Sequence, residues 1–139
     1  MPRLAYARVC MSRPHLVIVS PALADANNGN WQTARRWQRL LRPHTARIVR
    51  DWPDAQADQD DLMLALHARR SAPAVAAWHA QRGARGLGVV LTGTDLYHDL
   101  QRELSDDASA RRSLQLAGLL AVLNPLGLQA LPVPCQGKA

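Results

Sequence analysis

The sequence has only two cysteines, no phenylalanine and a single lysine among its 139 residues. Cys10 and Cys135 lie far apart in the chain and form no Cys-x-x-Cys pair, so neither a disulfide framework nor a zinc site is predicted. No apolar run approaches the ~18 residues that a membrane-spanning helix needs. The sequence therefore predicts a protein without a membrane anchor, in a reducing, cytoplasmic compartment.

Several catalytic and phosphate-binding signatures are absent as well. The chain has neither a Gly-x-Gly-x-x-Gly turn nor the Gly-Lys-Ser/Thr ending of a P-loop. It also lacks any metal-ligand spacing, a nucleophile elbow and a defensible Ser–His–Asp set. Neither a metal ion nor a bound cofactor is therefore predicted.

Positive charge is abundant and comes almost entirely from arginine. Lysine and arginine together number 17 against 11 acidic residues, which gives a formal net charge of +6. Such an excess favours anionic partners, for example phosphate, a nucleotide or nucleic acid. A solvated surface rich in arginine explains the charge equally well. The length and an apolar fraction of 47% fit one globular domain with a sizeable core.

Apolar runs alternate with helical patterns along the chain. The apolar runs predict about five buried strands, at residues 15–20, 46–52, 62–68, 86–93 and 118–124. Helical spacing of apolar residues predicts helices between them, chiefly at residues 31–42, 72–83 and 106–117. Such alternation predicts an α/β fold with a doubly wound, Rossmann-like parallel sheet.

The domain is expected to span residues 14–134. Residues 1–13 are predicted to be a disordered extension, and Met11 could be the true start. Their early arginines and apolar stretch resemble a signal peptide only superficially, because Pro21 interrupts the apolar run. Residues 135–139 are predicted to fray.

Polar residues and glycines follow three of the predicted strands. In open parallel sheets, ligands bind beyond the carboxyl ends of the strands, where the strand order reverses. The residues that the sequence places there are Asn27, Asn28, Gly29 and Asn30 after the first strand, His67, Arg69, Arg70 and Ser71 after the third, and Thr92, Gly93, Thr94 and Asp95 after the fourth.

The segment Asn-Asn-Gly-Asn at residues 27–30 has two explanations. Gly29 permits a positive φ and a close approach to a ligand, and the following helix N-terminus suits an anion. The asparagines can both donate to and accept from phosphate or sugar hydroxyls. However, Asn and Gly also form ordinary turns and helix caps, and on these residues alone the turn is the slightly better explanation.

The residues after the third and fourth strands are equally open to two explanations. His67 could bond a sugar hydroxyl or a phosphate oxygen, although a histidine tied into the edge of the core is favoured without other information. Arg69 and Arg70 suit bidentate oxyanion binding but could be a solvated pair, and Ser71 is expected to cap the next helix. Asp95 could bind a hydroxyl, act as a base or cap a helix.

Three segments together resemble one family. The stretches VIVSPALADANNGNWQTARRW, LALHARRSAPAVAAW and VVLTGTDLYHDL are similar to bacterial glycosyltransferases that include the selenosugar synthases of selenoneine biosynthesis, and SLQLAGLLAVLNPLGLQALP fits the next segment. The resemblance covers about residues 14–134. It implies a GT-B retaining glycosyltransferase that needs no metal and transfers a sugar from a UDP-sugar donor to selenophosphate.

The resemblance also implies roles for single residues. The loop after the first strand corresponds to Asn27, Asn28, Gly29 and Asn30. His67 corresponds to a histidine that faces the donor sugar, and Gly93, Thr94 and Asp95 correspond to a turn at the cleft. His67 and Asp95 are the catalytic candidates that result. Many relatives carry a second histidine where this chain has Thr92.

The largest departure from the family is length. Its members continue into a C-terminal domain that holds most of the nucleotide-sugar site, so this chain is expected to be the N-terminal half and to be inactive alone. In that hypothesis its partners are the UDP-sugar, selenophosphate and the missing C-terminal domain, and nucleic acid is not expected. The alternatives are a small basic Rossmann-like module that binds a nucleotide or nucleic acid without catalysis, and a decayed remnant.

Overall fold

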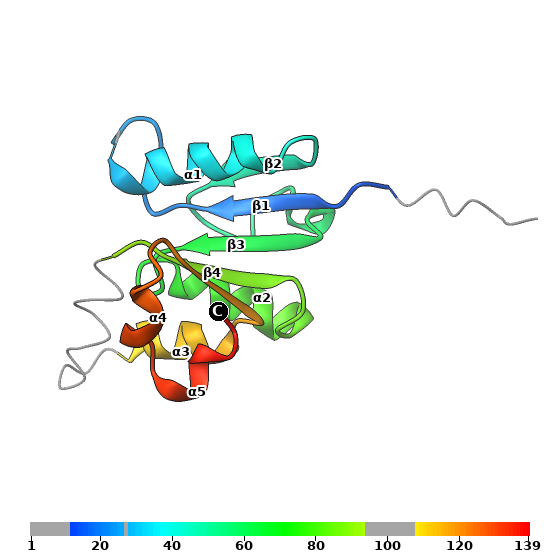
Figure 1. Ribbon diagram of the computed structural model, residues 1–139. Helices are drawn as coiled ribbons and strands as arrows, with labels where there is room; N and C mark the ends of the chain where they lie inside the picture. Colours follow the sequence, from blue (N-terminus) through cyan, green and yellow to red (C-terminus); the bar gives the residue numbers. More distant parts are fainter. Residues whose placement is uncertain (1–11, 27, 94–107) are drawn as a thin grey trace, which may run out of the picture.

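The computed structural model describes residues 12–26, 28–93 and 108–139, and within them the chain forms an α/β domain (Figure 1). Five parallel strands build one sheet in the order β2-β1-β3-β4-β5. The strands are β1 (His15–Val19), β2 (Thr45–Val49), β3 (Leu62–Leu66), β4 (Leu87–Leu91) and β5 (Leu119–Val122). The predicted Rossmann-like parallel sheet is therefore confirmed.

Helices cover the sheet from both sides. Helix α1 (Gly29–Leu40) lies on one face, and α2 (Ala72–Arg82) and α3 (Ser109–Leu116) pack against each other on the opposite face (Figure 1). The shorter elements are η1 (Ala57–Gln59), α4 (Gly127–Ala130) and α5 (Val133–Gln136). The helix expected to follow Asp95 lies outside the described residues.

The core has two layers because successive side chains of a strand point to opposite faces. Val17 and Val19 of β1 belong to the larger cluster with α2 and α3, whereas Ile18 belongs to the smaller cluster under α1. In α1, Ala34 is buried in that smaller cluster, and Trp37 and Leu41 pack against it. These are the apolar positions at helical spacing that predict this helix.

All five predicted strands extend one to three residues too far at their carboxyl ends. The apolar pattern continues through His67 and Ala68, but β3 ends at Leu66. His67 has φ 71°, which no β-strand residue adopts, so the chain turns there. The second strand likewise ends at Val49 rather than at residue 52.

The loop after β2 is tied to the edge of the sheet by Arg47. Its guanidinium pairs with Asp54 at 2.7 Å and with the buried Asp60 at 2.5 Å. These bonds raise the pKa of Arg47, with the bond to Asp60 as the largest cause, and the bond from Arg47 lowers the pKa of Asp54. The indole N–H of Trp52 also donates to Asp60, at 3.0 Å.

Residues 135–139 do not fray as the sequence predicts. Helix α5 buries Cys135 in the larger core cluster. The backbone N–H of Leu120 donates to the carbonyl of Lys138 at 2.9 Å, and the Lys138 ammonium donates to the carbonyls of Leu114 and Gln115, also at 2.9 Å. The last carbonyls of a helix have no partner within it, so Lys138 supplies donors that α3 needs.

Candidate functional site

A polar cavity of about 290 Å³ lies beyond the carboxyl ends of β1, β3 and β4. It is lined by Asn28, Gly29, Asn30, Thr33, His67, Arg70 and Thr92. Strands β1 and β3 are neighbours in the sheet, while the connection after β1 leads away to β2 on its other side. The cavity therefore occupies the point where the strand order reverses, which is where ligands of such sheets bind.

Asn28 caps helix α1 from inside this cavity. Its side-chain oxygen accepts from the backbone N–H groups of Asn30 at 3.1 Å and Trp31 at 3.3 Å. The carbonyl of Asn28 accepts from Gln32 as the first helical bond, at 3.1 Å. The cap explanation is thus confirmed for Asn28. The same bonds use three of the first N–H groups of the helix, so an anion here would meet the helix dipole rather than a row of unbonded donors.

Gly29 contributes space rather than an unusual backbone. It is the first residue of α1 and is not among the glycines with positive φ, so the expectation of a positive φ is wrong at this position. A Cβ built on Gly29 would meet no other atom within 4 Å. The missing side chain therefore adds space beside the cavity without being required by the fold.

His67 has the least common backbone conformation in the site. At φ 71° it occupies the left-handed region that few residues other than glycine adopt, and its side chain is only 3% exposed. Its N–H donates to Val90 at 2.9 Å, and its carbonyl accepts from Ser71 at 3.0 Å. These bonds on both sides hold the residue in a conformation that costs on the order of 1–2 kcal/mol.

The imidazole of His67 is oriented by the turn that follows it. The backbone N–H of Arg70 donates to Nδ1 of His67 at 3.2 Å. Because Nδ1 accepts this bond, a neutral ring carries its proton on Nε2. In a neutral His67, Nε2 is therefore the ring nitrogen that donates a hydrogen bond.

The two arginines after β3 serve different surfaces. Arg70 lines the cavity beside His67. Arg69 instead lines a separate hollow of about 420 Å³ between α2 and α3, together with Arg112. The chain direction turns between the two residues, so sequence adjacency does not make them one binding pair.

Ser71 also lies outside the lining of the polar cavity. It is buried at the N-cap position of α2, as the sequence predicts, but its hydroxyl makes no capping bond. Instead the hydroxyl donates to the carbonyl of Leu66 at 2.5 Å. Ser71 therefore closes the turn that contains His67.

Among the lining residues, Thr33 is missing from the residues that the sequence places at this edge of the sheet. Thr33 lies four residues after Gly29 in α1, so both face the same side of the helix. Helical spacing from the Asn-Gly segment is the signal that would have found it. Thr92 directly follows β4 and lines the cavity, whereas its neighbour Gly93, with φ 120°, does not. Asn27, Thr94 and Asp95 lie outside the described residues.

The side chains that line the cavity suit a polar, anionic ligand. Among its described lining residues the only full charge is the guanidinium of Arg70, and no carboxylate is present. Asparagine and threonine side chains offer both donors and acceptors to hydroxyl groups. No cluster of three or more metal-ligating side chains occurs among the residues that the structure describes. Within that same part of the chain, no helix is long and apolar enough to cross a membrane.

A scan against models of protein families finds no match, and a search of curated protein sequences finds none either.

Proposed function

We propose that this chain is the N-terminal, acceptor-side domain of a glycosyltransferase resembling the selenosugar synthases, and that the polar cavity belongs to its cleft. The observation that carries the proposal is His67. A buried histidine held at positive φ at the switch point of a parallel sheet is a strained residue in a ligand-binding position, and such strain clusters at functional sites.

In this proposal Arg70 and the positive end of helix α1 attract the selenophosphate anion. The Nε2–H of His67 donates to a hydroxyl of the donor sugar and so orients the sugar. The selenium lone pair forms the bond to the anomeric carbon as the bond from that carbon to the diphosphate oxygen breaks. UDP departs with the electron pair of the broken bond. Since the selenium acceptor is already a strong nucleophile, general-base assistance contributes little.

A second Rossmann-like domain would hold the UDP moiety across the cleft, as in GT-B enzymes. The cavity lining described above has only one cation for a diphosphate, which is consistent with a nucleotide site located mainly elsewhere. We therefore expect the 139-residue chain to bind selenophosphate without turning over a UDP-sugar. Full turnover by this chain alone would contradict the half-enzyme hypothesis.

The adjacent arginines provide a matched test of the site. Calorimetric titration with selenophosphate, and with inorganic phosphate for comparison, would use the wild type, Arg70→Ala and Arg69→Ala. Loss of Arg70 removes a charge-assisted bond and should weaken binding about 10-fold or more. Arg69→Ala removes the same charge one residue away, outside the cavity, and should change the affinity by less than about 2-fold. Equal losses, or no binding by the wild type, would remove the cavity from the proposal.

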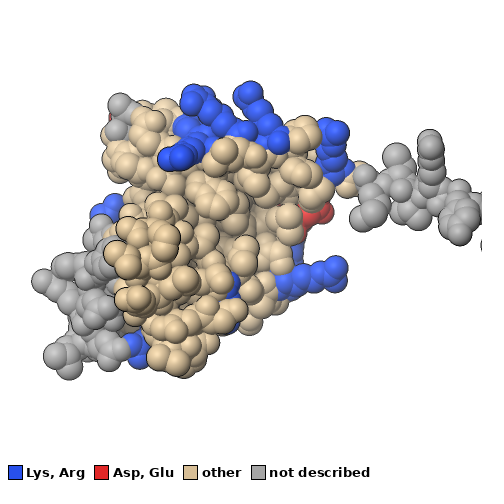
Figure 2. Space-filling view, viewed as in Figure 1, with Lys and Arg blue, Asp and Glu red and all other residues tan. Residues whose placement is uncertain are grey.

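A basic module that binds nucleic acid is the second candidate. Figure 2 shows Lys and Arg side chains gathered over the region of α1, which contains Arg35, Arg36 and Arg39. Binding of this kind falls steeply with salt, because cations on the protein displace the counterions of the phosphates. Fluorescence anisotropy with a single-stranded oligonucleotide at low and physiological salt would distinguish the two functions. Tight, salt-sensitive binding that Arg36→Ala weakens and Arg70→Ala does not would favour the second candidate.

A further inference from the structure

The turn that carries His67 is bonded to helix α3 as well as to itself. The hydroxyl of Ser113, in α3, donates to the carbonyl of Ala68 at 2.6 Å, across 45 positions of the sequence. Both residues are buried, Ser113 with 1% and Ala68 with 0% of its surface exposed. Ser113 does not line the polar cavity, so the effect of this bond on the cavity passes through the turn.

The Ser113 hydroxyl also has an acceptor within its own helix. Serine in a helix often donates to the carbonyl four residues earlier, and here the carbonyl of Ser109 lies 3.0 Å from the hydroxyl. A hydroxyl has one proton to donate, and the carbonyl of Ala68, at 2.6 Å, is the closer acceptor. Ser113 therefore does not need Ala68 for its own hydrogen bonding, whereas the bond gives the buried carbonyl of Ala68 a donor.

Ala68 lies between two residues that line the polar cavity, His67 and Arg70. The carbonyl of Ala68 belongs to the peptide unit that leads to Arg69, and the next peptide unit carries the N–H of Arg70. That N–H donates to Nδ1 of His67 at 3.2 Å. Because each peptide unit is a rigid plane, a bond that fixes the Ala68 carbonyl restricts the direction of the chain toward Arg70. The bond thus restricts the donor that orients the imidazole.

The bonds made by Ser71 hold the same turn in a different way. Its hydroxyl donates to the carbonyl of Leu66, and its N–H donates to the carbonyl of His67. These bonds join parts of one local segment to each other. The bond from Ser113 instead joins the segment to α3, and Ala68 itself packs in the larger core cluster to which α3 contributes. Helix α3 therefore fixes the position of the turn relative to the core.

We propose that Ser113 is a positioning residue for the polar cavity, and that it acts through the carbonyl of Ala68 to hold residues 67–71 in the conformation in which the Arg70 N–H meets Nδ1 of His67. The proposal rests on the proposed function in taking this cavity as the selenophosphate site, but the geometry of the turn does not depend on a ligand. Without the hydroxyl, the turn populates other conformations. The apparent affinity for a ligand then falls with the fraction of chains that keep the competent one.

The first test compares the wild type, Ser113→Ala and Ser113→Thr by NMR of the ¹⁵N-labelled full chain without ligand. Two-bond ¹H–¹⁵N spectra, recorded where the imidazole is neutral, report which ring nitrogen of His67 carries the proton, and His67→Asn identifies its signals. The wild type and Ser113→Thr, which both have the hydroxyl, should show the Nε2–H tautomer. Ser113→Ala should show mixed tautomers and an upfield shift of the Arg70 amide proton, because its bond to Nδ1 weakens.

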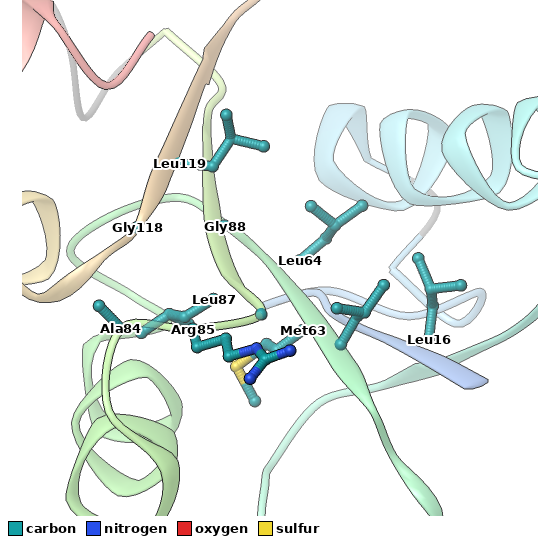
Figure 3. A pocket seen from close by; sticks show the side chains of 11 residues that line it. Leu16, Met63, Leu64, Ala84, Arg85, Leu87, Gly88, Gly118 and Leu119 are labelled. Carbon is teal, nitrogen blue, oxygen red and sulfur yellow. The ribbon is translucent and has the colours of Figure 1, made fainter. Parts of the chain in front are cut away.

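Two control variants lose stabilising contacts away from the turn. Lys138→Met is the matched control, because Lys138 also bonds α3, but through the carbonyls of Leu114 and Gln115. Leu119→Ala lies at the opposite edge of the sheet. Figure 3 shows Leu119 beside an apolar hollow of about 370 Å³ at the amino ends of the strands, and no described residue that lines this hollow also lines the polar cavity. In both controls the His67 signals should match those of the wild type.

Calorimetric titration with selenophosphate gives the second readout. Ser113→Ala should weaken binding about 2- to 10-fold, the change that one net hydrogen bond produces, while Ser113→Thr and both controls leave the affinity unchanged. Unchanged His67 signals or unchanged affinity in Ser113→Ala, a Ser113→Thr variant that behaves like Ser113→Ala, or equal effects in Lys138→Met would overturn the proposal. If the wild type does not bind selenophosphate, the proposed function fails, and the spectra alone decide the role of Ser113.

Discussion

At the residue scale, the polar cavity combines side chains that stabilise the fold with side chains that do not. Asn28 caps α1 and Ser71 bonds the carbonyl of Leu66, so replacing either one disturbs the chain itself. Gly29 and Arg70 make no comparable contribution, since one lacks a side chain and the other is exposed. Substitutions at the second pair can therefore report on ligand binding with little effect on stability.

Gly29→Ala should distinguish an effect on ligand binding from an effect on stability. Alanine is the better helix former, by up to about 1 kcal/mol in a helix interior and less at a first turn, and the new Cβ meets no atom within 4 Å. Thermal unfolding should thus occur at an equal or slightly higher temperature. Binding of selenophosphate should weaken if the anion approaches the start of α1 closely. Unchanged affinity would place the anion elsewhere in the cavity.

The fold should be nearly as stable with asparagine at position 67 as with histidine, and much less stable with valine. Asparagine adopts the left-handed conformation more readily than most residues, and its side-chain oxygen can accept the Arg70 N–H in place of Nδ1. Valine can do neither, so His67→Val should lose about 2 kcal/mol or more of unfolding free energy in urea titrations. His67→Asn should remain close to wild type in stability while losing the Nε2–H donor. Similar stabilities of the two variants would contradict the assigned backbone strain.

At the scale of elements, strand β2 lies at the edge of the sheet and depends on a tether for its following loop. Arg47 of β2 pairs with Asp54 and Asp60, and Arg82 of α2 stacks on Trp78 and donates to the carbonyls of Ala57 and Asp60. One charged network thus joins an edge strand, a loop and a helix. Such a network fixes the loop because a broken link would leave a buried partner such as Asp60 unsatisfied.

This network makes part of the stability dependent on pH. The folded state lowers the pKa of Asp54 below its ordinary value of 3.8, so the unfolded chain binds more protons in acid. The contribution of Asp54 is complete above about pH 5 and is lost as the pH falls through the folded pKa. Urea unfolding should show wild type more stable than Asp54→Asn at pH 7, by a small amount because the carboxyl is partly exposed.

The difference in unfolding free energy between wild type and Asp54→Asn should then decrease toward zero near pH 3. Asp58→Asn is the control, since Asp58 is exposed and forms no ion pair in the part of the chain that the structure describes. Its difference from wild type should stay constant with pH. A gap for Asp54→Asn that widens in acid would contradict the lowered pKa.

At the scale of the whole molecule, the C-terminal segment closes the domain. It packs Leu131 and Cys135 into the larger core cluster and bonds the end of α3 through Lys138. The same face of the sheet carries α2 and α3, so the segment packs into that layer. Residues 131–138 therefore belong to the folded core of the domain.

Removal of residues 133–139 should lower the unfolding free energy by about 2–4 kcal/mol, through lost burial and lost hydrogen bonds. Lys138→Met keeps the apolar stem and removes only the donors, so it should cost about 1 kcal/mol. Urea titration of both proteins against wild type measures the two contributions. If the truncated chain is as stable as the full one, the result would support the prediction that this segment frays.

Local patterns in the sequence were sufficient to predict the parallel α/β sheet and the edge of the sheet at which the cavity lies. Continuous apolar runs can bury themselves only between two layers of helices, and parallel strands bring their carboxyl ends together, so Asn28, Gly29, Asn30, His67 and Arg70 meet as expected. Which adjacent residues point to different surfaces could be seen only in the folded structure. Arg69 and Ser71 leave the cavity because His67 turns the backbone at positive φ, and Lys138 orders the last residues through carbonyls of a helix more than 20 positions away. Backbone turns and long-range hydrogen bonds of this kind depend on packing between distant segments, which no local pattern of residue types records.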